Sequence, residues 1–310
     1  MEIILQLTVN SLIAAGTYLL IATGFNLIYG ATKFVNMAHG SVAILGGYAF
    51  LFLAKNGFGL ALSFMGAVLL AGVSGVIFNK LVFEKLRSRK TSNLVSFVAS
   101  LGIFTVVQAL LAILFSSQFQ SPSFLKGNEK IFGLAGTAIT ATQLAIILTS
   151  LTVFIGVTLL LKKTNFGRAI RAVSDDIEVA KIIGINTDRL LNGVFFIGSA
   201  LAGLAGALVA LDIGLQPTLG LFFVLEGAIA SIVGGIGNIY GGALGSLILG
   251  FAENFGVWKI SSEWKTVIAF SVLIVFLIFS TPRPDEQKIN GVPYSFSHYL
   301  CDLRHFELES

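Results

Sequence analysis

Long uncharged runs are the feature that most constrains how this chain of 310 residues folds. They cover residues 3–32, 59–79, 91–125, 131–161, 190–211, 227–252 and 266–282. A helix crosses a bilayer with about 20 apolar residues, and most of these runs reach that length. A large soluble helical core would need polar faces within the runs, and they have none. The chain is therefore predicted to be an all-α, polytopic integral membrane protein.

The runs divide into about eight or nine membrane segments. We expect them near residues 3–29, 34–54, 59–80, 92–116, 140–161, 192–211, 218–234, 237–252 and 265–280. Those within 213–252 are short and glycine-rich, and they are read either as two spans or as one span with a re-entrant segment. The first segment is too long for a cleavable signal peptide and lacks a basic start. The expected domains are a transmembrane domain over 1–280 and a polar cytoplasmic tail over 281–310.

Basic residues predict the orientation of the chain. Two polar stretches, 80–90 and 162–189, hold more than half of the 20 lysines and arginines. The positive-inside rule places both in the cytoplasm, so the loop at 117–139 is external. Counting spans then puts the N-terminus outside and the C-terminus inside. Orientation alone requires this charge pattern, so it carries no signal for nucleic acid, and membrane lipid is the expected surrounding.

The stretch "GFNLIYGATKFVNMAHGSVAILGGYAF", residues 24–50, places polar groups inside would-be spans. Its notable residues are Asn26, Asn36, His39 and Gly40. Polar side chains at that depth are costly unless they face a partner or a cavity, and glycines let a neighbouring helix approach closely. Two interpretations stay open for each residue, a contact between helices or the lining of a solute path. The density of polar groups favours the path for the stretch as a whole.

The stretch "TNFGRAIRAVSDDIEVAKIIGINTDRLLNG", residues 164–193, is polar and has helical periodicity. Apolar residues recur at spacings of three and four, at Phe166, Ile170, Val173, Ile177 and Ala180. Gly184 is expected to end this helix, and a second short helix is expected to begin near Thr187. An amphipathic helix between spans needs its apolar face covered by the membrane domain, the lipid surface or a partner protein.

The stretch at 217–256 is rich in glycine and carries two acidic residues. Buried carboxylates in a membrane are functional candidates. Glu226 is read equally as a path residue or a boundary residue, whereas a boundary position is favoured for Glu253. In the tail, His298, Cys301 and His305 have spacings that a metal site can have, but a solvated tail is the favoured interpretation.

Several catalytic motifs are missing from the sequence. It has no phosphate-binding loop, H-E-x-x-H, C-x-x-C or G-x-S-x-G motif. We therefore expect no enzyme, no metal site and no cofactor. Active transport would draw its energy from an ion gradient or from another subunit.

Taken in order, the three stretches resemble permease subunits of branched-chain amino acid ABC transporters, of the LivH type. The likeness rests on "GFNLIYGATKFVNMAHGSVAILGGY", "TNFGRAIRAVSDDIEVAKIIGINTDR" and "IVGGIGNIYGGALGSLILGFAE" and spans about residues 10–280. The family commonly has Phe at Met37, and many members carry Lys near Glu226, so the chain departs from the pattern at these positions.

The resemblance implies that the middle stretch is a coupling segment, residues 162–192, that docks on an ATP-binding cassette subunit. The residues expected to couple are Thr164, Gly167, Arg168, Arg171, Ala172, Asp175, Asp176, Gly184 and Ile185. An apolar ridge flanked by charges is expected to enter a groove of that subunit. The translocation path is expected to contain Asn26, Asn36, His39, Gly40 and Glu226.

The resemblance also implies partners and a location. The expected partners are two ATPase subunits, a second permease chain in a homodimer or heterodimer, and an extracytoplasmic solute-binding protein. The expected location is the plasma (inner) membrane, and the expected cargo is branched-chain or other hydrophobic amino acids. A urea or short-chain amide permease is the alternative within the class. An ion-coupled secondary transporter is the alternative outside it, but it leaves residues 164–192 without a role.

Overall fold

The structure is a computed structural model that describes residues 2–122, 131–134 and 137–280. The α-helices are α1 (Glu2–Thr32), α2 (Ala38–Lys55), α3 (Leu60–Phe78), α4 (Glu84–Ser88), α5 (Asn93–Phe115), α6 (Ala141–Lys163), α7 (Asn165–Asp175), α8 (Ile177–Ile182), α9 (Thr187–Asp212), α10 (Leu219–Gly234), α11 (Ile239–Gly256) and α12 (Lys265–Ser280). Shorter elements are the π-helix η1 (Asn79–Phe83), the 3₁₀ turns η3 (Val257–Lys259) and η4 (Ser262–Trp264), and the strands β1 (Ile131–Leu134) and β2 (Thr137–Thr140).

Long helices occupy every predicted membrane segment. Within the described part of the chain, seven helices are long and apolar enough to cross a membrane. α10 and α11 form a further pair, bent by 113° at a short break, and would make an eighth span if the pair counts as one. The prediction of an all-α, polytopic membrane protein is confirmed.

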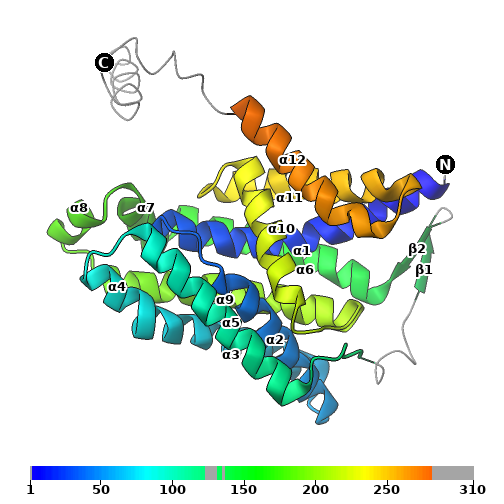
Figure 1. Cartoon of the computed structure of the whole chain (residues 1–310), viewed down its shortest axis with the longest axis horizontal. Helices are drawn as coiled ribbons and strands as arrows, with labels where there is room; N and C mark the ends of the chain where they lie inside the picture. The colour runs from blue at the N-terminus through cyan, green and yellow to red at the C-terminus, as the bar shows by residue number, and fades with distance from the viewer. Residues whose placement is uncertain (1, 123–130, 135–136, 281–310) are drawn as a thin grey trace. The chain divides into compact units, whose positions relative to one another are not determined.

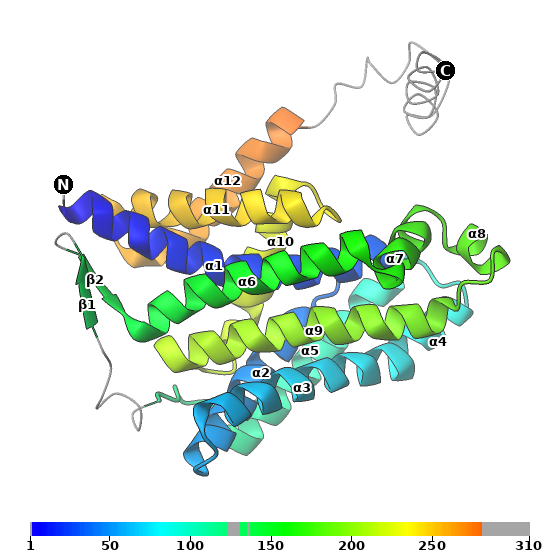
Figure 2. The same cartoon turned by 180° about the vertical axis from the view of Figure 1, so that it is seen from behind.

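Residues 1–273 form one compact unit, and residues from 274 belong to a second. The tail over 281–310, with its histidines and Cys301, lies outside the described residues. In the first unit α1 packs against α6, α9, α10 and α11, and α9 packs against α2 and α3. Figures 1 and 2 show α1, α6 and α11 running side by side. This arrangement puts the middle of α1 at the centre of the unit.

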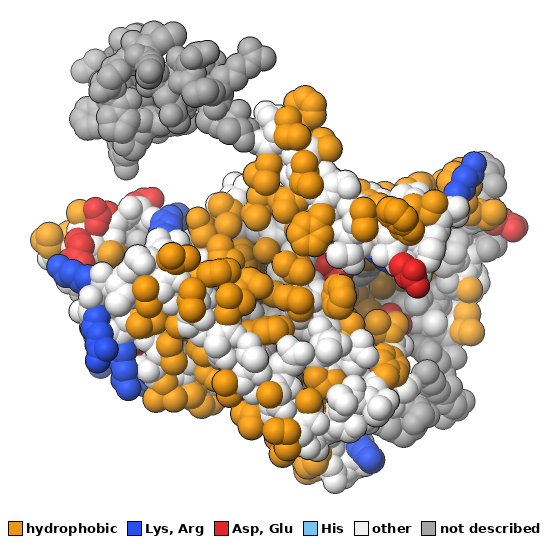
Figure 3. Space-filling view, viewed as in Figure 1, with side chains coloured by type: hydrophobic (Ala, Val, Ile, Leu, Met, Phe, Trp, Pro, Cys, Tyr) orange, Lys and Arg blue, Asp and Glu red, His pale blue; other side chains and the backbone are white. Residues whose placement is uncertain are grey.

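The two ends of the first unit differ in composition. One end carries α4, α7 and α8, whereas the other carries the start of α1 and the β1–β2 hairpin (Figures 1 and 2). Lysines and arginines gather at the first end, and apolar side chains cover the broad region beside it (Figure 3). Both basic stretches of the sequence therefore lie at the same end, as the predicted topology requires.

The hairpin was not predicted from the sequence. β1 and β2 pair antiparallel, with Ile131 opposite Thr140. The side chain of Gln6 fixes the hairpin to α1, since its Nε2 donates to the Ala138 carbonyl at 3.3 Å and its Oε1 accepts from the Ala138 amide at 3.1 Å. Thr140 then caps α6 by accepting a hydrogen bond from the backbone amide of Gln143.

Helix α2 begins deep in the unit rather than at its edge. The sequence predicted this membrane segment at 34–54, but the helix starts at Ala38. The preceding connection is buried, with Phe34 only 4% exposed. His39, near the start of α2, lies level with Ile21 of α1, and the end of α1 at Thr32 is about 16 Å further along its axis at ~1.5 Å per residue. The chain therefore folds back into the unit before α2 begins.

Glycines bring α2 and α9 into backbone contact. A Cβ on Gly47 would lie 2.7 Å from the Gly206 carbonyl oxygen, and one on Gly46 would lie 2.7 Å from that of Gly203. Neither position has room for a larger side chain. Small residues on both helices allow the close approach that stabilises helix pairs in a membrane.

Candidate functional site: two cavities and a coupling segment

The polar start of α2 is buried against α1. His39 is 1% exposed, and its Nε2 lies 3.2 Å from the carbonyl oxygen of Ile21. Its Nδ1 is buried and has no hydrogen-bond partner among the described residues. The side chain of Asn36 accepts a hydrogen bond from the Ala38 amide at 3.2 Å and so closes the turn into the helix. Asn36 therefore has a local structural role, and His39 joins two helices.

Gly40 sets the distance between α2 and α10. A Cβ at this position would lie 2.9 Å from the side chain of Val224 and would also overlap the carbonyl oxygen of Gly220. The predicted path residue Gly40 thus permits a close backbone contact between the two helices.

Asn26 of α1 holds the break between α10 and α11. Its Oδ1 accepts a hydrogen bond from the Gly237 amide at 2.8 Å, while its buried Nδ2 has no partner among the described residues. Gly235 and Gly237 have φ values of 101° and 84°, a backbone region that glycine adopts most easily. Asn238 then caps α11 by accepting from the Tyr240 amide at 3.0 Å.

A cavity of about 550 Å³, cavity 1, opens beside Asn26. It is lined by Asn26, Leu27, Gly30, Thr158, Leu161, Lys162, Ile170, Arg171, Ser174, Asp175, Gly237, Asn238, Ile239 and Tyr240. The hydroxyl of Thr158 is buried there without a hydrogen-bond partner among the described residues. Cavity 1 brings Asn26 together with Arg171 and Asp175, which the sequence assigned to the coupling segment.

A second cavity of about 500 Å³, cavity 2, contains Glu226. Its lining is Asn10, Ile13, Ala14, Thr17, Tyr18, Gln143, Ile146, Val209, Asp212, Ile213, Leu219, Phe222, Phe223, Glu226, Asn254, Lys265 and Thr266. Glu226 is half-buried on α10. The structure therefore separates Glu226 from the other predicted path residues.

The two cavities lie at opposite ends of the same three helices. Cavity 2 takes the first half of α1, the start of α6 and the end of α11, whereas cavity 1 takes their other ends. From Tyr18 to Asn26 the distance along α1 is about 12 Å at ~1.5 Å per residue. Between them lie Ile21 and Phe25, which are 0% and 2% exposed, and the ring of His39. These three residues contact one another and form a buried layer at the level of α1 between cavities 1 and 2.

A buried pair that the sequence did not predict lies beside cavity 2. Tyr18 Oη donates a hydrogen bond of 2.5 Å to Glu253 Oε2. Glu253 is 1% exposed, and the boundary position favoured by the sequence stays a prediction. The partner of Glu253 comes from α1, 235 residues away in the chain, so no local pattern could identify the contact.

The predicted coupling segment forms two helices rather than one. α7 begins at Thr164, whose hydroxyl accepts a hydrogen bond from the Gly167 amide at 3.2 Å. A Cβ on Gly167 would overlap the Leu161 carbonyl, so only glycine fits here. Arg171 donates to the same carbonyl at 2.6 Å, which fixes α7 against the end of α6.

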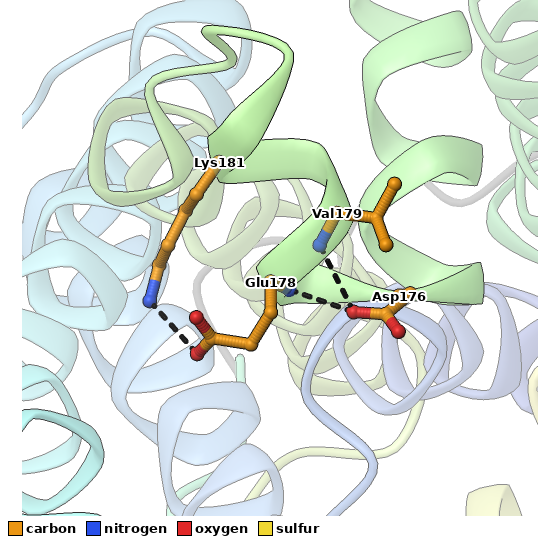
Figure 4. A network of polar contacts seen from close by, with 4 residues as sticks. All are labelled: Asp176, Glu178, Val179 and Lys181. Atoms are coloured by element: carbon orange, nitrogen blue, oxygen red, sulfur yellow. Dashed lines mark hydrogen bonds and ion pairs between the residues drawn. The ribbon is translucent and has the colours of Figure 1, made fainter.

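Asp176 breaks the segment because its carboxylate caps the next helix. Asp176 Oδ1 accepts from the amides of Glu178 at 2.8 Å and Val179 at 3.1 Å, with φ at −151° (Figure 4). Lys181 and Glu178 form an exposed ion pair at 3.4 Å. After α8, Gly184 turns the chain with φ at 87°. The short helix expected near Thr187 is instead the first turn of the long helix α9.

The apolar ridge of this segment faces the chain itself. Ile170, Val173 and Ala180 are buried in a cluster with residues of α1 and α9. The expectation that the ridge enters a groove of a partner is therefore wrong, because its own helices already cover it. The outward surface carries Arg168, Asp175 and Asp176, and the apolar side chains Ile182 and Ile183 are 83% and 67% exposed.

Comparisons with known proteins give a consistent result. The family described as branched-chain amino acid transport system permease component matches residues 7–277. The chain is 31% identical to the high-affinity branched-chain amino acid transport system permease protein BraD of Pseudomonas aeruginosa, over 92% of this chain and 98% of that protein. It is 30% identical to the corresponding protein LivH of Escherichia coli, over 92% and 97%.

A more distant relative belongs to an import system with another cargo. The autoinducer 2 import system permease protein LsrC of Yersinia enterocolitica is 28% identical, over 86% of this chain and 72% of that protein. No solved structure matches the chain significantly.

Proposed function

The chain belongs to the family of permease components of branched-chain amino acid transport systems, and we propose that it is the permease subunit of an ABC importer. It forms the translocation path for branched-chain or other hydrophobic amino acids. Separate ATP-binding subunits supply the energy. The observation that carries this proposal is cavity 1, where the coupling segment and the polar centre of α1 meet.

Cavity 1 gives a route by which movement of the coupling segment would reach the membrane helices. Arg171 and Asp175 of α7 line it opposite Asn26, and Asn26 holds the α10–α11 break through the Gly237 amide. A force on the exposed face of α7 would therefore reach Asn26 of α1 through the wall of cavity 1. From Asn26 it would reach the α10–α11 break through the Gly237 amide. The exposed charges around Arg168 and the exposed apolar tip of α8 are the surface that an ATPase subunit would contact.

The proposed topology places this coupling end in the cytoplasm and the hairpin end outside. The positive-inside rule supports it, because both basic stretches lie at the coupling end. The proposed location is the plasma (inner) membrane. The hairpin end would meet a solute-binding protein, and a second permease chain would complete the membrane part.

Uptake measurements test the proposal. Labelled L-leucine and labelled urea are offered to cells with and without the chain, at normal and depleted ATP and with the ion gradient clamped. We expect leucine uptake that requires both the chain and ATP. Urea uptake alone would replace the proposed cargo. Uptake that follows the ion gradient and ignores ATP would refute the ABC importer.

Two variants test the coupling segment. Gly167→Pro removes the amide that bonds to Thr164 and adds atoms where a Cβ already overlaps Leu161. A double exchange of Arg168 and Asp175 reverses charge on the exposed face and leaves the buried ridge unchanged. Both should abolish uptake at normal membrane levels of the chain. The matched control Gly156→Ala lies in α6 with open space around it and should transport normally.

A further inference from the structure

Cavity 2 contains opposite charges that interact electrostatically without direct contact. Glu226 of α10 and Lys265 of α12 both line it, and no ion pair within 4.0 Å joins them. Asp212 is the third charged residue of the lining. Both Glu226 and Lys265 are half-buried. Charges in such a shielded position interact more strongly than in water and are costly without a counter-charge.

The neighbouring carboxylate is already occupied. Glu253 receives the hydroxyl of Tyr18 and is almost completely buried. Tyr18 itself lines cavity 2, whereas Glu253 is not part of the lining. Glu226 is the acidic residue of α10 and α11 that lines the space, and it has Tyr18 and Lys265 as polar neighbours.

Apolar residues form the rest of the wall. Ile13, Ile146, Val209 and Phe223 come from α1, α6, α9 and α10 and line the same cavity. A volume of about 500 Å³ falls within the range of about 300–1,000 Å³ typical of small-molecule sites, which combine an apolar lining with a few polar groups. The cavity thus offers the carboxylates of Glu226 and Asp212, the ammonium group of Lys265 and an aliphatic wall.

We propose that cavity 2 is a binding site for a zwitterionic α-amino acid with an apolar side chain, with Glu226 receiving the ammonium group and Lys265 the carboxylate. The aliphatic wall takes the side chain. The inference rests on the proposed function and adds to it a site in the permease chain itself. Such a ligand brings a positive group to Glu226 and a negative group to Lys265 at once, whereas urea carries neither charge.

Cysteine protection tests this site directly. The sequence has one cysteine, so Cys301→Ser gives a background without thiols. Ala14→Cys then places a reporter in cavity 2, and Ser174→Cys places a matched reporter in cavity 1. The full transporter, reconstituted in nanodiscs without a solute-binding protein, is treated with a maleimide in the presence of millimolar L-leucine, leucinamide or 4-methylpentanoate.

We expect L-leucine to slow alkylation of Ala14→Cys several-fold and to leave Ser174→Cys unchanged. Leucinamide lacks the carboxylate and 4-methylpentanoate lacks the ammonium group, so each should protect far less. Glu226→Gln and Lys265→Gln should each remove the protection by leucine. The comparison of analogues uses the unaltered charged residues and is independent of how these variants fold.

Equal alkylation of Ala14→Cys with and without leucine would overturn the site, as would equal protection by all three compounds. Slowing of both reporters would indicate a general conformational change and would also overturn it. ATP-dependent leucine uptake without protection would refute this site and leave the proposed function intact. Protection without such uptake would refute the importer and leave the site.

Discussion

Two tyrosines in this chain should respond in opposite ways to loss of the hydroxyl group. Tyr18 Oη donates a 2.5 Å hydrogen bond to Glu253, and both residues are buried. Tyr48 is 1% exposed, stacks on Phe115 with ring centroids 4.9 Å apart, and has a buried hydroxyl without a partner among the described residues. Tyr18→Phe and Tyr48→Phe are therefore the same chemical change in two contrasting environments.

The expected magnitudes follow from these environments. Hydrogen bonds between membrane helices contribute on average about 0.6 kcal/mol, but bonds to carboxylates contribute ~1.5–3 kcal/mol. The bond of Tyr18 is short, buried and directed to a carboxyl group, so the larger value applies to Tyr18→Phe. A hydroxyl buried without a partner costs ~1–3 kcal/mol, so Tyr48→Phe should be neutral or stabilising.

Thermal unfolding of the purified chain in one detergent measures the difference. At roughly 2–4 °C per kcal/mol, the Tm of Tyr18→Phe should lie at least about 3 °C below that of Tyr48→Phe. A double-mutant cycle with Glu253→Leu should give a coupling of at least ~1 kcal/mol, because removing both partners leaves no unpaired buried group. Equal Tm values for the two tyrosine variants, or no coupling in the cycle, would refute the assignment of this hydrogen bond.

Three further changes give independent tests. Gly206→Ala should destabilise the chain by ~1–3 kcal/mol, because the new Cβ overlaps the Ala43 carbonyl, and a Tm equal to that of wild type would contradict the close α2–α9 contact. Asn26→Leu should sharply lower leucine uptake at unchanged membrane levels, because the Gly237 amide loses its acceptor, and normal uptake would remove Asn26 from the mechanism. Asp176→Ala removes a helix cap that contributes ~0.5–2 kcal/mol, so amide exchange over Ile177–Ile182 should accelerate, and unchanged exchange would contradict the cap.

The sequence predicted the membrane helices well because their length and polarity are set locally by the bilayer. Every uncharged segment contains a long helix, and the apolar spacing at Ile170 and Val173 identified the amphipathic helix α7. The same spacing did not show what covers that face. Residues of α1 and α9 cover it, and they come from distant parts of the chain, so the periodicity of α7 alone does not predict this contact.

The sequence does not reveal roles that depend on partners far away in the chain. The depth at which α2 starts depends on the contact between His39 and Ile21, and the burial of Glu253 depends on Tyr18. The hairpin has short strands in a segment that reads simply as a loop between spans. The sequence shows that polar residues inside spans are unusual, but it does not distinguish those that join helices from those that line cavities.

The buried layer between cavities 1 and 2 is built where its helices meet through glycines. Gly24 lies against α9 and the ring of His39, Gly40 against α10, and Gly227 against Ile21. Interlocked large side chains would resist sliding, because a packed core has few alternative arrangements. At each of these contacts the glycine contributes no side chain, so at most one of the two helices has a side chain to disengage. If α7 moves α1 and α10 through Asn26, these glycine contacts are the places where the layer can open at the smallest packing cost.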